Sequence, residues 1–159
     1  MALSVLWERC EKTVSALYDQ GYRDFICGGA TGFDTLAASC IGQMKEQRQG
    51  MRLILVLPCA DQTRGWKETD QSLYDMQIEK ADRVLMLSPH YYPGCMMVRN
   101  RFMVDHASFC VAYLDGHSGG TMSTVRYALH RHLPILNLAI EEEVLRYLQE
   151  HNTADPLPF

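Results

Sequence analysis

The chain alternates between short apolar runs and longer stretches in which apolar residues recur every three or four positions. Runs of four to seven apolar residues predict buried strands, and the wider spacing predicts helices with one buried face. The strands are expected at residues 24–27, 51–57, 83–87, 108–114 and 134–138. The helices are expected at residues 3–19, 33–49, 69–81, 96–107, 121–132 and 141–149, with Thr69 and Asp70 capping the third and Thr121 opening the fifth.

Strict alternation of strands and helices predicts an α/β fold in three layers, a mostly parallel sheet between two layers of helices. Residues 1–150 are expected to form a single domain, and residues 151–159 a surface tail. In such folds ligands bind beyond the carboxyl ends of the strands. The loops that follow the first four strands are therefore expected to converge on one edge of the sheet.

A first glycine-rich loop, Gly28-Gly29-Ala30-Thr31-Gly32, lies between the first predicted strand and the helix that starts at Phe33. A loop almost without side chains lets the backbone approach a ligand, and it aims free helix N–H groups at an anion. This is the chemistry of a phosphate or carboxylate cradle. The alternative is a tight strand-to-helix turn that binds nothing.

A second loop, Asp115 to Gly120, precedes Thr121 and the next predicted helix. Gly119 and Gly120 free the backbone, and the Thr121 hydroxyl could bond a phosphate oxygen. The alternative is a glycine turn followed by an ordinary threonine N-cap.

Four other polar residues are candidates for ligand contacts. Arg99 could clamp an anionic group and Asn100 could bond a ribose or base, unless both lie on a solvated helix face. Asp61 and Gln62 could hydrogen-bond a sugar or base, and Trp66 could stack on it. The alternative there is a polar loop that a buried tryptophan holds in place.

Composition narrows the function classes. The 159 residues carry a net charge of −4 without a block of like charges, which disfavours a nucleic-acid partner. The six histidines and six cysteines show no metal-binding spacing, so neither a metal nor a cofactor is predicted. The cysteines predict reduced thiols, and no stretch resembles a signal peptide or a membrane span, so a cytoplasmic location is expected.

Four strings taken together resemble the YpsA-like branch of the SLOG superfamily, which also contains DprA and the Lonely guy phosphoribohydrolases. The resemblance spans about residues 10–138 and rests on GGATGFDTLAA, LPCADQ with Trp66, YYPGCMMVRNRFMVDHA and AYLDGHSGGTMSTVRYA. It implies a Rossmann-like fold and a nucleotide pocket. In it Gly28, Gly29, Gly32, Gly119, Gly120 and Thr121 would surround the phosphate or sugar, beside Arg99 and Asn100. Related domains often self-associate, so a homodimer is expected.

The chain departs from this pattern at two places. The branch usually begins with a strand that ends in a T-G-H-R-P-like loop, and this chain starts at the helix that follows it. The related hydrolases carry a catalytic glutamate three positions after the threonine of their second glycine loop, where this chain has Thr124.

Three function classes remain from the sequence, and it identifies no catalytic residue. The leading hypothesis is a sensor or accessory protein that binds a nucleotide or nucleotide-derived molecule between the two glycine loops. The second is a nucleotide phosphoribohydrolase or N-glycosidase that uses Asp61 or Asp115 in place of the missing glutamate. The third, a DNA-binding module of the DprA kind, is disfavoured by the acidic net charge.

Overall fold

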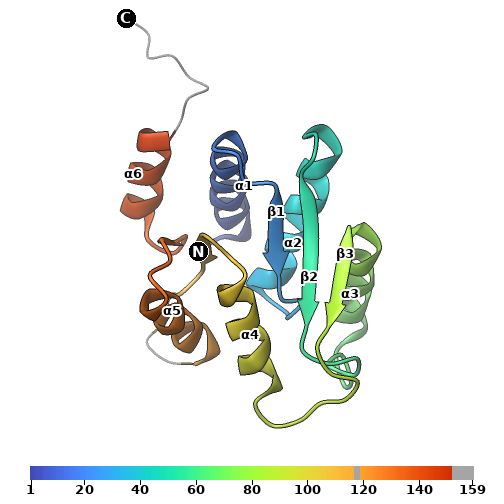
Figure 1. Ribbon diagram of the computed structural model, residues 1–159. Helices are drawn as coiled ribbons and strands as arrows, with labels where there is room; N and C mark the ends of the chain where they lie inside the picture. The colour runs from blue at the N-terminus through green and yellow to red at the C-terminus, as the bar shows by residue number, and fades with distance from the viewer. Residues whose placement is uncertain (117–118, 152–159) are drawn as a thin grey trace, which may run out of the picture.

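The computed structural model describes residues 1–116 and 119–151, and its helices and strands alternate along the whole of that range (Figure 1). The strands are β1 (Asp24–Cys27), β2 (Arg52–Leu57), β3 (Arg83–Met86), β4 (Cys110–Ala112) and β5 (Ile135–Asn137). The helices are α1 (Leu3–Asp19), α2 (Phe33–Met44), α3 (Glu68–Lys80), α4 (Cys95–Asp105), α5 (Gly120–His130) and α6 (Glu141–His151). The predicted α/β fold is confirmed. The expected tail after residue 151 lies outside the described residues.

The strands form two parallel sheets rather than the single continuous sheet expected. In one sheet β2 lies between β1 and β3, and in the other β4 pairs with β5. Among the described residues, β1 and β4 share no ladder, but aromatic pairs join the segments that flank them. The rings of Tyr22 and Phe109 lie 6.2 Å apart before the two strands, and those of Phe33 and Tyr113 lie 6.1 Å apart after them.

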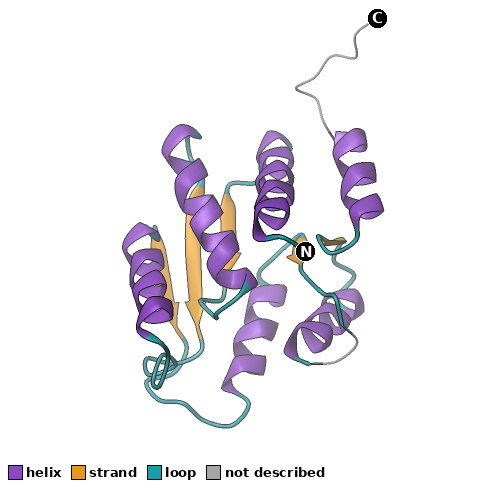
Figure 2. Ribbon diagram, turned by 180° about the vertical axis from the view of Figure 1, so that it is seen from behind, coloured by secondary structure: helices purple, strands orange, loops and turns teal. Residues whose placement is uncertain are grey.

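Helices cover both faces of the three-stranded sheet. Seen from behind, α2 and α3 lie in front of its strands (Figure 2), while α4 packs against β2 from the other side. Strand β2 is the centre of the core, since Leu53, Leu55 and Leu57 are fully buried as its uninterrupted apolar sequence predicts. In Figure 1 the arrowheads of β1, β2 and β3 all point to the lower end, so their loops gather there.

Several element ends differ from the sequence prediction for local reasons. Helix α2 tightens into a 3₁₀ turn at Lys45–Gln47 instead of running to residue 49. Helix α3 starts at Glu68 after Lys67, with no side-chain cap, so the predicted cap at Thr69 and Asp70 is wrong. The ladder of β4 stops early because the Asn137 side chain bonds both backbone groups of Leu114. No described helix is long and apolar enough to cross a membrane.

Candidate functional site

The loops after β1, β2 and β3 are connected at the carboxyl end of the three-stranded sheet. The Ala60 amide donates to the Ser88 carbonyl at 3.1 Å, and the Tyr91 amide donates to Asp61 Oδ1 at 2.8 Å. Partial desolvation raises the pKa of the Asp61 carboxyl, but the hydrogen bonds from the Tyr91 amide, the Cys59 thiol and its own amide, together with the charge of Arg64, outweigh it, so the pKa lies below the usual value. These bonds tie the loop that carries Asp61, Gln62 and Trp66 to the segment leading into α4.

Side chains of neighbouring elements pack against the first glycine loop. A Cβ on Gly28 would lie 2.8 Å from Arg99 Nη1 and 2.9 Å from Asp34 Oδ2. A Cβ on Gly29 would overlap the side chain of Leu57, and Gly29 and Gly32 have positive φ angles of 72° and 83°. Glycine is therefore required at Gly28 and Gly29 by the surrounding side chains, before any ligand is considered.

Arg99 is the buried cation behind this loop. The residue is only 4% exposed, which excludes the alternative that Arg99 lies on a solvated face of its helix. The guanidinium donates to the Gly28 carbonyl through Nη1 and to Asn100 Oδ1 through Nε at 2.7 Å. Burial lowers the pKa of Arg99, and the nearby Asp34 partly offsets this. Arg99 thus holds the loop backbone, and Asn100 orients Arg99.

Asp34 is a site residue that the sequence reasoning missed. It lies in the first turn of α2, and its Oδ2 accepts a hydrogen bond from the Ala30 amide at 3.2 Å. Burial raises the pKa of the Asp34 carboxyl, and the charge of Arg99 and the loop amides partly offset that rise. The sequence contained a clue to this role. An acid in the first turn of a helix, next to a loop predicted to bind an anion, would repel that anion unless it had another function.

Gln62 is buried beside the first loop without a partner. The residue is 6% exposed, and neither its Nε2 nor its Oε1 has a hydrogen-bond partner among the described residues. Its Nε2 lies 3.3 Å from the position that a Cβ on Gly29 would take. A buried amide usually finds partners, and this one keeps hydrogen-bonding capacity that the described residues leave unused, although both of its polar atoms are shielded from solvent. Trp66 packs edge-on against Tyr74 at 5.6 Å, as a loop-fixing residue would.

The second glycine loop is open where the first is packed. A Cβ on Gly119 or Gly120 would have no atom within 4 Å, counting only what the structure describes. Helix α5 begins at Gly120 with Gly119, at a φ of 102°, as its N-cap, and no side chain caps it, so the alternative in which Thr121 is an ordinary N-cap is excluded. Thr121 is exposed, and the first turn carries no acid. His117 and Ser118 of this loop lie outside the described residues.

Two aromatic residues connect the glycine loops. Phe33, at the start of α2, lies against Tyr113, which follows β4. The Tyr113 hydroxyl donates to Asp115 Oδ2 at 3.1 Å, and this bond raises the pKa of Tyr113. Tyr113 therefore links Asp115, through its hydroxyl, and Phe33, through its ring. In residues 1–116 and 119–151, no group of three or more His, Cys, Asp and Glu side chains could hold a metal ion.

Comparison with known proteins identifies the family of this chain. The family model described as "YspA SLOG family" matches residues 1–151. The chain belongs to the YspA SLOG family. Among its relatives are the SPbeta prophage-derived protein YoqJ of Bacillus subtilis (strain 168), 27% identical over 69% of this chain, and a UPF0398 protein of Bacillus pumilus (strain SAFR-032), 24% identical over 76% of it. A UPF0398 protein of Ligilactobacillus salivarius (strain UCC118) is 25% identical over 70%.

The alignments span 71% of YoqJ, and 66% and 62% of the two UPF0398 proteins. The chain therefore matches about two thirds of these relatives. Membership of the SLOG family fits a nucleotide-related role, in agreement with the resemblance seen in the sequence.

Proposed function

We propose that the protein binds a nucleotide or nucleotide-derived small molecule between its two glycine loops and acts as a sensor or accessory protein. The observation that carries the proposal is the contact of Phe33 with Tyr113, which places the start of α2 and the loop before α5 side by side. Each helix has a glycine with positive φ as its N-cap and no side-chain cap, so the first turn of each presents free backbone N–H groups.

The phosphate binds at α5. Gly119, Gly120 and Thr121 are exposed, the first turn has no acid, and a Cβ at either glycine would find open space. The free N–H groups and the positive end of the helix dipole then face an anion without competition. The Thr121 hydroxyl, which caps nothing, is available to donate to a phosphate oxygen.

The sugar and base bind at the first loop. There the Asp34 carboxyl stands close to the Arg99 guanidinium, so the loop offers little net positive charge to an anion. A carboxylate is instead a good acceptor for ribose hydroxyls. Asp61 lies on the loop after β2, and the unpartnered, shielded amide of Gln62 on the same loop reaches a base edge or a hydroxyl only after its side chain turns outward. Arg99 and Asn100 serve this half of the site by holding Gly28 in place.

The test is calorimetric titration of the protein with a panel of nucleoside mono- and diphosphates. Gly120→Val should abolish binding of any nucleotide that the parent binds, because the branched side chain occupies the open space at α5. The matched control is His130→Val, which places the same side chain on the exposed far end of α5. Equal affinity in parent, variant and control would reduce the second loop to a plain turn.

A second candidate function is hydrolysis of the N-glycosidic bond of a nucleoside monophosphate. The observation in its favour is Asp115, which accepts a hydrogen bond from the hydroxyl of Tyr113, whose ring lies near Phe33. A positioned carboxylate contributes on the order of 10²–10⁴-fold to proton transfer in such a reaction. Release of free base from adenosine, guanosine and cytidine monophosphates, measured beside Asp115→Asn and Asp61→Asn, separates the two functions. Turnover that one substitution removes would make the protein an enzyme.

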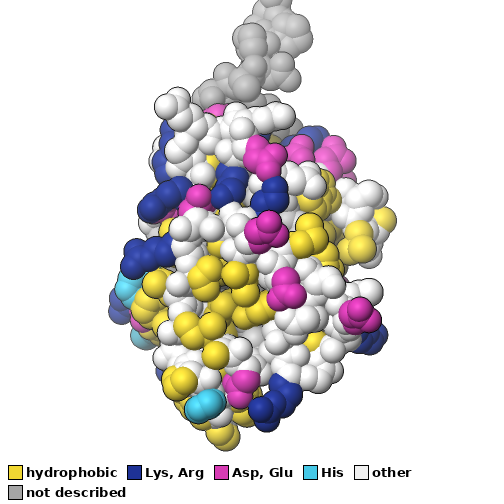
Figure 3. All heavy atoms as spheres, turned by 90° about the vertical axis from the view of Figure 1, so that its right-hand side faces the viewer, with side chains coloured by type: hydrophobic (Ala, Val, Ile, Leu, Met, Phe, Trp, Pro, Cys, Tyr) yellow, Lys and Arg dark blue, Asp and Glu magenta, His cyan; other side chains and the backbone are white. Residues whose placement is uncertain are grey.

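We also place the protein in the cytoplasm as a homodimer. Apolar side chains gather on the face that holds β3 and α3 (Figure 3). Val84 and Met86 of β3 are 38% and 45% exposed, although parallel strands are usually buried on both faces. A second copy would cover this surface. Sedimentation equilibrium of the parent and of Val84→Lys tests it, and a monomeric parent would contradict it.

A further inference from the structure

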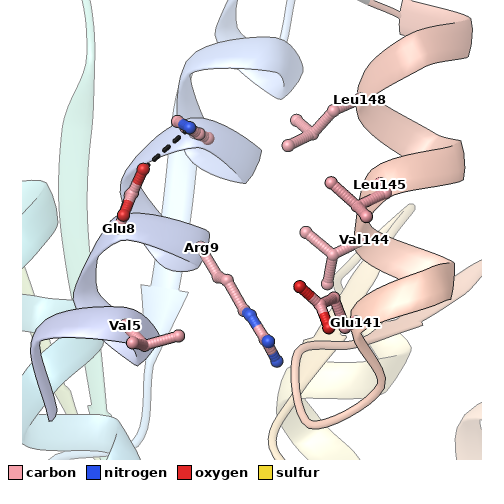
Figure 4. A pocket seen from close by; sticks show the side chains of 8 residues that line it. Val5, Glu8, Arg9, Glu141, Val144, Leu145 and Leu148 are labelled. Atoms are coloured by element: carbon pink, nitrogen blue, oxygen red, sulfur yellow. Dashed lines mark ion pairs between the residues drawn. The ribbon is translucent and has the colours of Figure 1, made fainter. Parts of the chain in front are cut away.

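A cavity separates two helices away from the glycine loops. It has a volume of ≈ 160 Å³ and lies between α1 and α6, the first and last helices of the described chain. Figure 4 shows Val144 and Leu148 pointing from α6 toward α1, where Val5 lies opposite. Leu145, which is 52% exposed, extends the apolar wall. One side of the cavity can therefore hold an aliphatic group.

Two opposite charges face the same cavity without an ionic partner. Arg9 extends from α1 toward the start of α6, where Glu141 lies (Figure 4). Arg9 Nη1 donates to the Leu138 carbonyl at 2.8 Å, which fixes the guanidinium and leaves its other N–H groups available. Within residues 1–116 and 119–151, neither Arg9 nor Glu141 takes part in an ion pair. The other two charges on the wall, Glu8 and Lys12, are 2.8 Å apart and neutralise each other.

This set of groups matches a small zwitterion with an aliphatic side chain. A guanidinium binds a carboxylate through paired N–H groups, and a carboxylate binds an ammonium. The volume suits the remaining part, because an apolar cavity of about 150 Å³ holds a benzene ring. A nucleotide fits poorly, since no aromatic ring lines the wall to stack on its base and a volume of ≈ 160 Å³ is small for it.

We propose that the cavity between α1 and α6 is a second binding site, which takes a free aliphatic α-amino acid such as leucine. Arg9 binds the carboxylate, Glu141 binds the ammonium, and the Val5, Val144, Leu145 and Leu148 side chains surround the aliphatic group. Every residue of the site belongs to α1 or α6, so the inference is independent of nucleotide binding at the glycine loops.

Equilibrium dialysis of the whole chain with radiolabelled leucine tests the site. A ligand of this size binds in the weak range, so concentrations of roughly 0.1–10 mM are appropriate. Leucine should bind at least about tenfold more tightly than 4-methylpentanoate, which lacks the ammonium, and than isoamylamine, which lacks the carboxylate. Arg9→Gln and Glu141→Gln should each weaken leucine binding by about tenfold or more, whereas Arg83→Gln on exposed β3 should leave it unchanged.

Each contrary result overturns the proposal in a specific way. Arg9→Gln also removes the bond to Leu138, so its melting temperature is measured beside its affinity. Glu141 is exposed and makes no hydrogen bond of this kind. If Arg9→Gln is unstable, the leucine affinity of Glu141→Gln therefore tests the proposed site. Absence of leucine binding, or equal binding by parent and Glu141→Gln, would overturn the site. Equal binding of leucine and 4-methylpentanoate would show that the ammonium group is not recognised, and would overturn the proposal that the site selects a zwitterion.

Discussion

The two glycine loops look alike in sequence and differ in structure. At the first, side chains press on the glycines: Leu57 against Gly29, and Arg99 with Asp34 against Gly28. At the second, no atom of the described residues would lie within 4 Å of a Cβ on Gly119 or Gly120, and no acid lies in the first turn of α5. Glycine therefore has a different role in each loop. In the first it lets the protein's own side chains pack against the backbone, and in the second, under the proposed function, it leaves room for a ligand.

The largest difference between the loops should appear in stability. Gly29→Ala places a methyl group against Leu57 in a backbone conformation that disfavours side chains, and it should cost about 2–4 kcal/mol of unfolding free energy. Gly120→Ala meets no atom and improves helix propensity, so its effect should stay within about 0.5 kcal/mol. Urea denaturation of both variants measures this. Similar stability of the two variants would remove the distinction between the loops.

Arg99 gives the next largest effect. Replacing it with methionine leaves the Gly28 carbonyl without its donor and Asp34 without a nearby cation, which should cost about 2–4 kcal/mol. Because the loop then loses its support, nucleotide affinity should fall together with the melting temperature. Arg101→Met, two positions along α4 and exposed, is the matched control; it should leave affinity unchanged and lose only the roughly 0.5–1 kcal/mol of its contact with the Tyr127 ring. A loss of affinity at unchanged stability would show that Arg99 contacts the ligand directly.

A smaller, pH-dependent effect should distinguish the first loop through Asp34. Burial raises the folded-state pKa of Asp34 above the ordinary value of an aspartate, so as the pH rises the folded protein keeps this proton to a higher pH than the unfolded chain does. The stability that this provides is fully present below the unfolded pKa and is lost as the pH rises through the folded pKa. Asp34→Asn lacks that loss, so the parent should become less stable relative to the variant as the pH rises from about 4.

Urea denaturation at a series of pH values measures this difference, with Asp75→Asn on exposed α3 as the control. A stability difference between the parent and Asp34→Asn that stays constant over the whole series would contradict the raised pKa. A trend in the opposite direction would mean that Arg99 dominates burial in setting the Asp34 charge.

Local patterns in the sequence predicted most of the fold, and long-range contacts explain what they missed. The apolar spacing of α2 and the uninterrupted run of β2 lead directly to their buried faces. The role of Arg99 could not be read in the same way, since its partner Gly28 lies 71 residues away in the chain. The early end of β4 likewise depends on an Asn137 side chain 23 residues from Leu114. Seven glycines have a positive φ, which explains why glycine is favoured at those positions. The backbone angle does not show which of them side chains also pack against.

The candidate site residues remain predictions, and the sequence suggests them where chemistry follows from residue type and not where it follows from neighbours. Gly119, Gly120 and Gln62 were proposed because backbone access and amide groups are visible in the sequence. The alternative role of Thr121 as an ordinary N-cap is excluded, because the helix starts one residue earlier with a glycine as its N-cap. Tyr113 was overlooked because its importance comes from Phe33 and Asp115, which only the folded chain places beside it.

Amide chemical shifts of the ¹⁵N-labelled protein during titration with a nucleoside monophosphate test the central claim most directly. If the two loops form one site, the amides of Gly28–Gly32 and of Gly119–Thr121 should shift together and follow a single dissociation constant. The α5 amides should shift most with inorganic phosphate alone, and the first-loop amides most with the nucleoside alone. Shifts confined to one loop, or separate dissociation constants for the two, would contradict a shared nucleotide site.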